Sequence, residues 1–248
     1  MPFLEHAGMI RPSDSAMIWR YMDFTKFVSM LHKRSLFFSN IEGLGDRFEG
    51  STPKGNELEL SDLPEEAKQH RLESLGYMRK LFWSQRQFLY VNCWHKNNGE
   101  SAAMWKLYLM SNEGLAVRST FGRLTASIDA APHEVFAGEV RYIDYATDSI
   151  ALGNALVPYT YKRASFAHEM EVRAMCIDPV ALAHRGPTTE IETLPGLYVE
   201  ADLEQLIEKV FVAPTSAEWF RELVEAMLKD HGIKAVVQRS DLDADPVL

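Results

Sequence analysis

The most informative segment of the chain is residues 162–175, KRASFAHEMEVRAM. Glu169, Glu171 and Arg173 recur there at every second position, and apolar residues follow them. Side chains alternate between the two faces of a β-strand, so the pattern predicts a strand with two carboxylates and a guanidinium on one face. That face is either a solvated edge strand or the wall of a functional site, because an unpaired charge is costly to bury.

Three other segments combine aromatic and polar residues in a similar way: WRYMD (19–23), LFFSN…DRFEG (36–50) and NCWHKNNGESAAMWKLY (92–108). Arg20 lies in an apolar strand pattern and needs a partner, for which Asp23 or a glutamate would serve. Cys93 and His95 share one face of a predicted strand, but two ligands are fewer than a zinc site uses. The pattern favours a buried thiol and a hydrogen-bonded imidazole.

The remaining chain alternates irregularly between strand and helix patterns. We expect strands near 18–22, 35–39, 90–95, 114–121, 139–145 and 168–177, with two more inside 197–214 and a last one at 235–240. We expect helices over 23–34, 64–90 and 100–108, within 148–168, and from a capping box at Thr215 or Ser216 with Glu218. This order predicts an α+β fold in a single domain, 1–248, with a mixed or antiparallel sheet and flanking helices.

Composition limits the class of protein. Hydrophobic residues make up 46% and charged residues 25%, which excludes a disordered chain. Two cysteines cannot form a disulfide framework. No apolar run is long enough to span a bilayer, and the opening residues MPFLEHAGMIRPSD lack the regions of a secretory signal. We therefore expect a cytoplasmic protein without a membrane partner.

Charge is concentrated at the C-terminal end. Residues 190–248 hold 13 acidic and 5 basic side chains, whereas the rest of the chain is near neutral. We expect this acidic segment to pack onto the body of the domain. The absence of a polybasic block argues against a large nucleic-acid footprint.

Taken in order, these four segments resemble the bacterial domain-of-unknown-function 2971 family over most of the chain. The family pattern stands here as WRYMD, LFFSN…DRFEG, NCWHKNNGESAAMWKLYLMSNEG and FAHEMEVR. The family name carries no activity.

A weaker resemblance does carry chemistry. The order of an Arg, an aromatic-Ser pair and Glu-x-Glu is similar to mono-ADP-ribosyltransferases of the Arg-Ser-Glu type, although Ser39 is followed by Asn40 rather than by a Thr. The resemblance implies a split sheet, with NAD as substrate and no metal. It implies that Glu171, Glu169 and Arg20 are catalytic. The residues that would contact NAD are then Arg20, Tyr21, Phe38, Ser39, Asp46, Trp105 and Arg173.

The implied reaction is cleavage of the nicotinamide–ribose bond with transfer of ADP-ribose to a macromolecule, either protein or nucleic acid. Such an enzyme could serve as a bacterial toxin or phage-defence effector. Two alternatives remain open. One is a metal-dependent nuclease-type effector in which Asp46, Glu49, Glu169 and Glu171 hold Mg²⁺. The other is a non-catalytic protein-binding module that uses Met104, Trp105, Tyr108 and the helix near 217–227.

Overall fold

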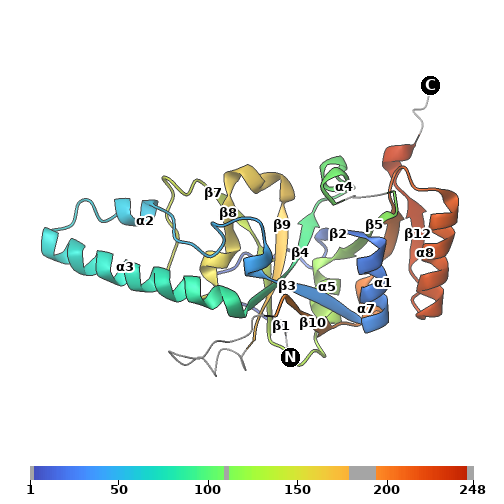
Figure 1. Ribbon diagram of the computed structural model, residues 1–248, viewed down its shortest axis with the longest axis horizontal. Coiled ribbons are helices and arrows are strands. Elements are labelled where there is room, and N and C mark those ends of the chain that lie inside the picture. Colours follow the sequence, from blue (N-terminus) through green and yellow to red (C-terminus); the bar gives the residue numbers. More distant parts are fainter. Residues whose placement is uncertain (1–2, 109–111, 179–193, 245–248) are drawn as a thin grey trace.

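The computed structural model describes residues 3–108, 112–178 and 194–244 (Figure 1). Its strands are β1 (Phe3–Leu4), β2 (Met17–Asp23), β3 (Ser35–Asn40), β4 (Leu89–Lys96), β5 (Gly114–Thr120), β6 (Val135–Glu139), β7 (Arg141–Ile143), β8 (Tyr161–Arg163), β9 (Glu171–Ile177), β10 (Gly196–Glu200), β11 (Lys209–Val212) and β12 (Val236–Arg239). Its α-helices are α1 (Phe24–Lys33), α2 (Gly55–Leu58), α3 (Glu65–Gln85), α4 (Ala102–Tyr108), α5 (Phe121–Ser127), α7 (Leu203–Leu206) and α8 (Glu218–Asp230). Short 3₁₀ helices are η1 (Ile41–Gly43), η2 (Arg86–Phe88), η3 (Val157–Thr160), η4 (Ala164–Glu169) and η5 (Asp241–Asp243).

Within the described residues, ten strands form one sheet in the order β1-β6-β9-β4-β2-β5-β11-β12, and β3 and β10 branch from β4. The pairs β1–β6 and β11–β12 are parallel, whereas the other pairs in this sheet are antiparallel. A separate two-stranded parallel sheet joins β7 and β8. The predicted α+β class with a mixed sheet and flanking helices is therefore confirmed. Strands β10, β11 and β12, from the acidic C-terminal segment, belong to the ten-stranded sheet.

The sheet divides at β4. One edge of β4 pairs with β9 from Leu89 to His95. On the other edge, β3 pairs only at Tyr90 and Val91, and β2 pairs only at His95 and Lys96. Residues 92–94 pair with neither strand, so β2 and β3 diverge from β4 as the two arms of a fork.

Helix α1 connects the two arms of this fork. Asp23 begins the helix as its N-cap, because its carboxylate accepts a hydrogen bond from the Lys26 N–H at 2.8 Å. Arg34 ends it in the left-handed conformation at φ 48°. Phe27 and Leu31 lie one turn apart and are fully buried against the sheet. The chain therefore returns from β2 to β3 over one face of the sheet.

The main core lies between the sheet and helices α1, α5, α7 and α8. From α8, Phe220, Val224 and Leu228 point into it at helical spacing. Burying a side chain of this size contributes roughly 1.5–3 kcal/mol. This packing fixes the sheet on which the fork is built.

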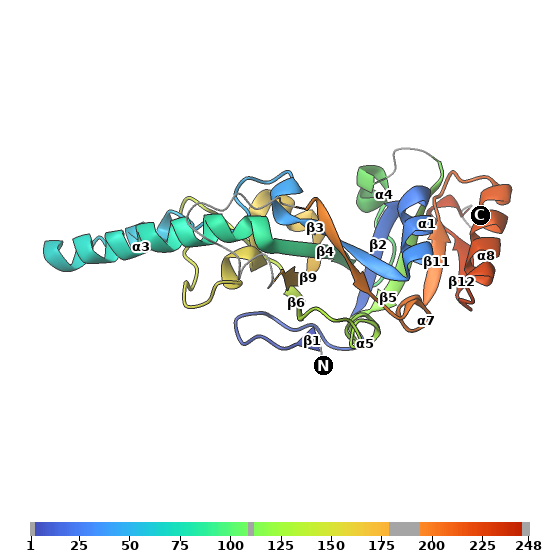
Figure 2. The same cartoon turned by 60° about the horizontal axis from the view of Figure 1, so that its bottom comes forward.

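Helix α3 extends away from the sheet, as Figures 1 and 2 both show. The predicted helix ran to Tyr90, but α3 ends at Gln85 because Leu89 and Tyr90 enter β4 and become buried there. None of the helices in the described part of the chain is both long and apolar enough to cross a bilayer.

Two other helix predictions need correction. Between residues 148 and 168 the chain forms the 3₁₀ helices η3 and η4 and no α-helix. The predicted capping box at Thr215 or Ser216 is also absent, since Ala217 is the N-cap of α8. The Glu218 carboxylate pairs with Arg221 and Arg239 instead.

Candidate functional site

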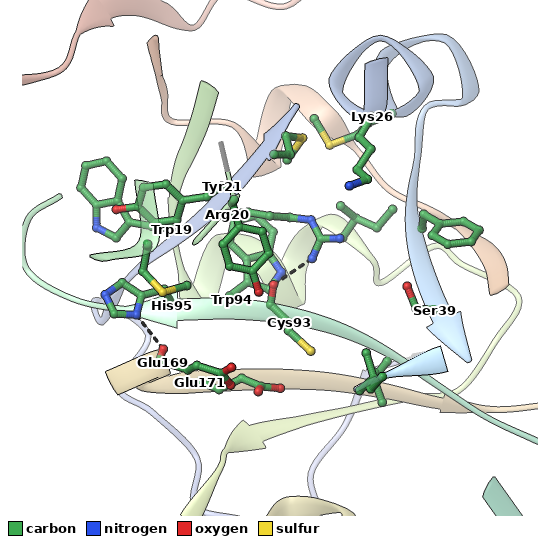
Figure 3. Close-up of a pocket in the computed structure, with 18 of the residues that line it drawn as sticks. Trp19, Arg20, Tyr21, Lys26, Ser39, Cys93, Trp94, His95, Glu169 and Glu171 are labelled. Atoms are coloured by element: carbon green, nitrogen blue, oxygen red, sulfur yellow. Dashed lines mark hydrogen bonds between the residues drawn. The ribbon is translucent and has the colours of Figure 1, made fainter. Parts of the chain in front are cut away.

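A cavity of about 430 Å³ opens at the fork of the sheet (Figure 3). Its walls come from β2, α1, β3, β4, α4, η4, β9 and β10. The volume lies in the usual range of small-molecule sites, roughly 300–1,000 Å³. Five of the predicted site residues line it: Arg20, Tyr21, Ser39, Glu169 and Glu171. In Figure 3 the two glutamates lie at one end, with Lys26 and Ser39 toward the other.

Arg20 brings an unpaired cation to this cavity. Its Nη1 donates to the Cys93 carbonyl at 2.8 Å, in the unpaired part of the β4 edge, and its guanidinium lies 6.0 Å from the Trp94 ring. Among the described residues it forms no ion pair, because Asp23 caps α1 and pairs with Lys26. Burial lowers the pKa of Arg20, but a guanidinium stays charged. Arg20 therefore brings to the cavity a guanidinium that forms no ion pair with a carboxylate of the described residues.

Glu171 is the first residue of β9, and its side chain is only 4% exposed. Its Oε1 accepts from Arg173 Nε at 2.6 Å, and its Oε2 contacts Lys162 Nζ at 2.7 Å. Burial disfavours the ionised form, but Arg173 and Lys162 outweigh it and hold the pKa of Glu171 well below its usual range. The carboxylate is therefore ionised and held in a fixed orientation.

Glu169 lines the cavity from the end of a 3₁₀ helix, whereas the sequence predicted it on the same strand as Glu171. Met170 adopts φ 40°, so the strand begins one residue later and Glu169 ends the 3₁₀ helix η4. Its Oε2 contacts Lys162 Nζ at 2.6 Å, which places it beside Glu171 although it is not on the strand. Burial raises the pKa of Glu169, and the neighbouring Glu171 charge raises it further.

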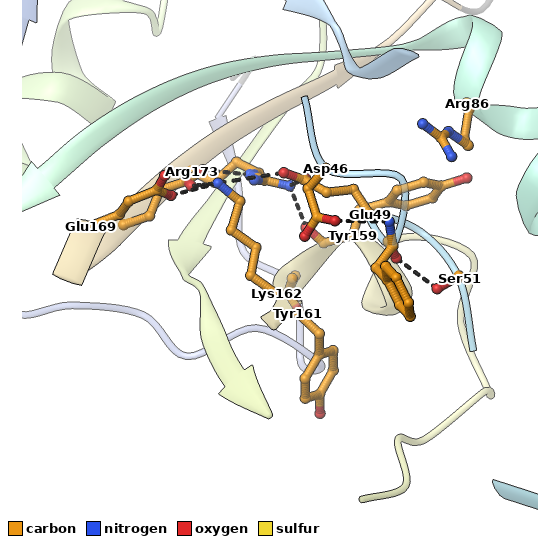
Figure 4. A network of polar contacts seen from close by, with 12 residues as sticks. Asp46, Glu49, Ser51, Arg86, Tyr159, Tyr161, Lys162, Glu169 and Arg173 are labelled. Atoms are coloured by element: carbon orange, nitrogen blue, oxygen red, sulfur yellow. Dashed lines mark hydrogen bonds and ion pairs between the residues drawn. The ribbon is translucent and has the colours of Figure 1, made fainter. Parts of the chain in front are cut away.

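A buried network of charges lies behind these glutamates (Figure 4). Arg173 Nη1 donates to Glu49 Oε2 at 2.5 Å and to the Tyr159 carbonyl at 2.9 Å, and both Arg173 and Glu49 are 1% exposed. The reading of this face as a solvated edge strand is wrong, because β9 lies between β4 and β6. Three carboxylates, Glu49, Glu169 and Glu171, share two cations, so the network carries one net negative charge when all are ionised.

Four predicted contact residues do not line the cavity. Phe38 is fully buried in the main core, because alternation along β3 turns Phe37 and Ser39 to the cavity instead. Asp46 pairs with Arg163 at 2.9 Å, and Arg173 lies behind Glu171.

Trp105 is the fourth of these residues. Its ring meets Tyr21 edge to face with centroids 4.9 Å apart, and its Nε1 donates to Glu100 at 2.8 Å. The binding-module alternative requires Trp105 to be accessible to a protein partner. It is only 2% exposed, so it is not accessible.

Cys93 and His95 both line the cavity, on β4. Burial raises the pKa of the Cys93 thiol, which is therefore protonated. Burial lowers the pKa of His95, whose Nδ1 lies 2.6 Å from the Glu169 carbonyl oxygen, so this neutral ring donates through Nδ1.

In the described part of the chain, no group of three or more His, Cys, Asp or Glu side chains is placed to hold a metal ion. The carboxylates that the nuclease alternative used are instead bonded to Lys162, Arg163 and Arg173.

Sequence reasoning missed some residues of the site. Lys162 stood in the segment first quoted, but nothing in its spacing indicated that it contacts three carboxylates. Tyr198 comes from β10, where its ring lies 5.1 Å from Phe37 and its hydroxyl 3.1 Å from Ser29 Oγ. Its place depends on the pairing of β10 with β3, which no local pattern predicts.

Comparison with known proteins adds little. No protein-family model matches the chain, and no curated protein matches it. A solved structure of Thermus sp. 2.9 DarT in complex with carba-NAD+ is similar with 10% sequence identity and a TM-score of 0.39, over 94% of this chain and 100% of that chain. A TM-score this low assigns neither a family nor a function. Since no family model matches, the resemblance to the domain-of-unknown-function 2971 family stays a prediction.

Proposed function

We propose that the chain is an NAD-consuming enzyme that cleaves the nicotinamide–ribose bond and transfers ADP-ribose to a macromolecule. One observation carries the proposal: Arg20, Ser39 and Glu171 come from three separate strands and line a single cavity at the fork of the sheet. The resemblance identified these three residues from their order along the chain, which does not specify how far apart they lie in space. Their presence in one cavity is therefore an independent observation.

Arg20 is suited to the pyrophosphate of NAD. A guanidinium binds phosphate oxygens in a bidentate fork, and Arg20 has no competing carboxylate among the described residues. A dinucleotide would supply the anion that this cation lacks. Tyr21 and Phe37 offer aromatic surface in the same cavity for the nicotinamide ring.

Glu171 is suited to the ribose. Loss of nicotinamide passes through an oxocarbenium-like state, as in glycoside cleavage. A preoriented carboxylate stabilises that developing positive charge, and the surrounding network keeps one net negative charge in spite of its two cations. The low pKa of Glu171 ensures that its carboxylate is ionised at neutral pH.

The reaction balances without a metal or an oxidant. The bond between C1′ of the ribose and the nicotinamide nitrogen breaks, and its electron pair leaves with neutral nicotinamide. A nucleophilic oxygen or nitrogen of the acceptor then bonds to C1′ and loses a proton. Glu169, whose pKa is raised and whose side chain is partly exposed, is placed to receive that proton.

The test is release of nicotinamide from NAD by the purified chain, measured by liquid chromatography with protein and with nucleic-acid acceptors. We expect Glu171→Gln to lower turnover by about 100-fold or more, as the loss of a transition-state stabiliser does. Glu208→Gln is the matched control, since Glu208 forms an ion pair with Arg118 at 2.7 Å and does not line the cavity.

Two results would refute the proposal. One is a wild-type chain that neither binds NAD nor releases nicotinamide with any acceptor. The other is a Glu171→Gln variant that turns over NAD as fast as the Glu208→Gln control.

A further inference from the structure

Lys162 occupies the centre of the charged network behind the cavity. Its Nζ lies 2.6 Å from Glu169 Oε2, 2.7 Å from Glu171 Oε2 and 3.4 Å from Glu49 Oε1. The side chain is 9% exposed, so water screens these contacts little. A single ammonium therefore contacts every carboxylate of the network.

The small sheet of β7 and β8 holds Lys162 in place. In its register Lys162 lies opposite Tyr142, and the Glu171 N–H donates to the Tyr142 hydroxyl oxygen at 2.8 Å. The Val140 N–H, just before β7, donates to the Glu171 carbonyl at 2.9 Å. The same pair of strands thus contacts both the backbone and the side chain of Glu171.

We propose that Lys162 is a positioning residue, whose ammonium sets the orientation and the charge that Glu171 presents to the cavity. The effect of Lys162 on catalysis rests on the function proposed above. Without Lys162, Glu49 and Glu171 share Arg173, Glu169 loses its ion-pair partner, and the network holds two net negative charges instead of one. At least one carboxylate then binds a proton, and Glu171 Oε2 loses the partner that orients it.

Other groups facing Glu171 cannot replace this contact. Burial disfavours the charged form of Lys162, but Glu171 and Glu49 raise its pKa, so it remains an ammonium across the physiological range. The remaining titratable groups around Glu171 are Arg173 on β9, Cys93 and His95 on β4, Tyr142 on β7, Tyr108 on α4, Glu169 on η4 and, beyond Arg173, Glu49. Of these only Arg173 is a cation at neutral pH, and its Nε already contacts Oε1.

The experiment compares Lys162→Met with Lys96→Met. Lys96 also lies on a strand and pairs with a carboxylate at 2.6 Å, but that carboxylate, Glu139, is not one of the three that Lys162 contacts. For Lys162→Met we expect kcat with NAD to fall at least tenfold, KM for NAD to change less than threefold, and the acid limb of the kcat profile to move to higher pH. A kcat and a pH profile equal to those of Lys96→Met would overturn the inference.

A second measurement does not depend on activity. Titration of ¹³C-labelled glutamate carboxyls by NMR should show Glu171 titrating at higher pH in Lys162→Met than in the wild type. If Lys162→Met does not fold, Lys162→Met/Glu169→Gln removes one charge of each sign, and its Glu171 should still titrate at higher pH than in Glu169→Gln alone. An unchanged titration in either comparison overturns the inference. A wild-type chain without NAD turnover refutes only the proposed function and leaves this titration to decide the role of Lys162.

Discussion

Replacing Arg173 by methionine tests the buried network most directly. The guanidinium has two carboxylate partners, Glu49 at 2.5 Å and Glu171 at 2.6 Å, and all three side chains are at most 4% exposed. Removing one partner of a buried ion pair leaves an uncompensated charge and costs roughly 3–5 kcal/mol. Arg173 also donates to the Tyr159 carbonyl, so we expect a loss at the upper end of that range.

That loss is a large part of the stability of a domain, which is about 5–15 kcal/mol. For a chain of this size about 1 kcal/mol lowers Tm by roughly 2–4 °C, so the variant should melt some 10–20 °C below the wild type. The assay is urea unfolding at pH 7 with scanning calorimetry. Arg221→Met is the matched control, since Arg221 also contacts two carboxylates, Glu218 and Glu225, but on the surface of α8 where water screens the charges.

The loss should depend on pH in a definite direction. The pKa of Glu171 is lower in the folded than in the unfolded chain, so its ion pairs stabilise the fold above the unfolded value of about 4.3 and less so as the pH falls. The difference between Arg173→Met and the wild type should therefore be largest at pH 7 and shrink towards acid pH. A loss no greater than that of Arg221→Met, or one that is equal at pH 7 and pH 4, would contradict this reasoning.

Three further predictions concern single side chains. Arg20→Gln should weaken binding of a non-hydrolysable NAD analogue about 10- to 100-fold by calorimetry, because a hydrogen bond to a charged group contributes roughly 1.5–3 kcal/mol; unchanged affinity would place the pyrophosphate elsewhere. Asp23→Ala should cost roughly 0.5–2 kcal/mol in urea unfolding by removing the N-cap of α1, an effect that should fade as the pH falls to about 2, the lowered pKa of Asp23. Phe38→Ala should cost roughly 3–5 kcal/mol as a core deletion, whereas Phe37→Ala should cost less and chiefly affect ligand binding; equal losses of stability would show that alternation along β3 was misread.

Local patterns in the sequence predicted many of the elements but few of their ends. The β-forming residues around Trp19–Arg20–Tyr21 predicted a strand and the apolar spacing of Phe27 and Leu31 predicted a helix, and both predictions agree with the structure. The end of α3 was misplaced because Leu89 and Tyr90 continue a helical pattern, yet pairing with β9 draws them into the sheet. At these two residues, pairing with a strand distant in sequence outweighs the local helical pattern.

The site was predictable only where a local pattern or the resemblance pointed to its residues. The strand face of Glu171 follows from period-two alternation, and Ser39 was named by the resemblance at the end of a predicted strand. Glu169 was misplaced because one left-handed residue, Met170, separates it from the strand. Tyr198 reaches the cavity, and Lys162 the network behind it, through pairings between strands that are separated in sequence, so no spacing along the chain could indicate them. The fork itself results from two strands sharing one edge of β4.

Helix α1 gives this fork a further property. Ten residues of α-helix are about 15 Å long, and this rigid segment separates the end of one arm from the start of the other. The distance between the end of β2 and the start of β3 is therefore set by a helix of fixed length and not by a flexible loop. Insertion of even one residue into α1 would rotate everything beyond it by about 100°, so the width of the opening depends on the length of α1.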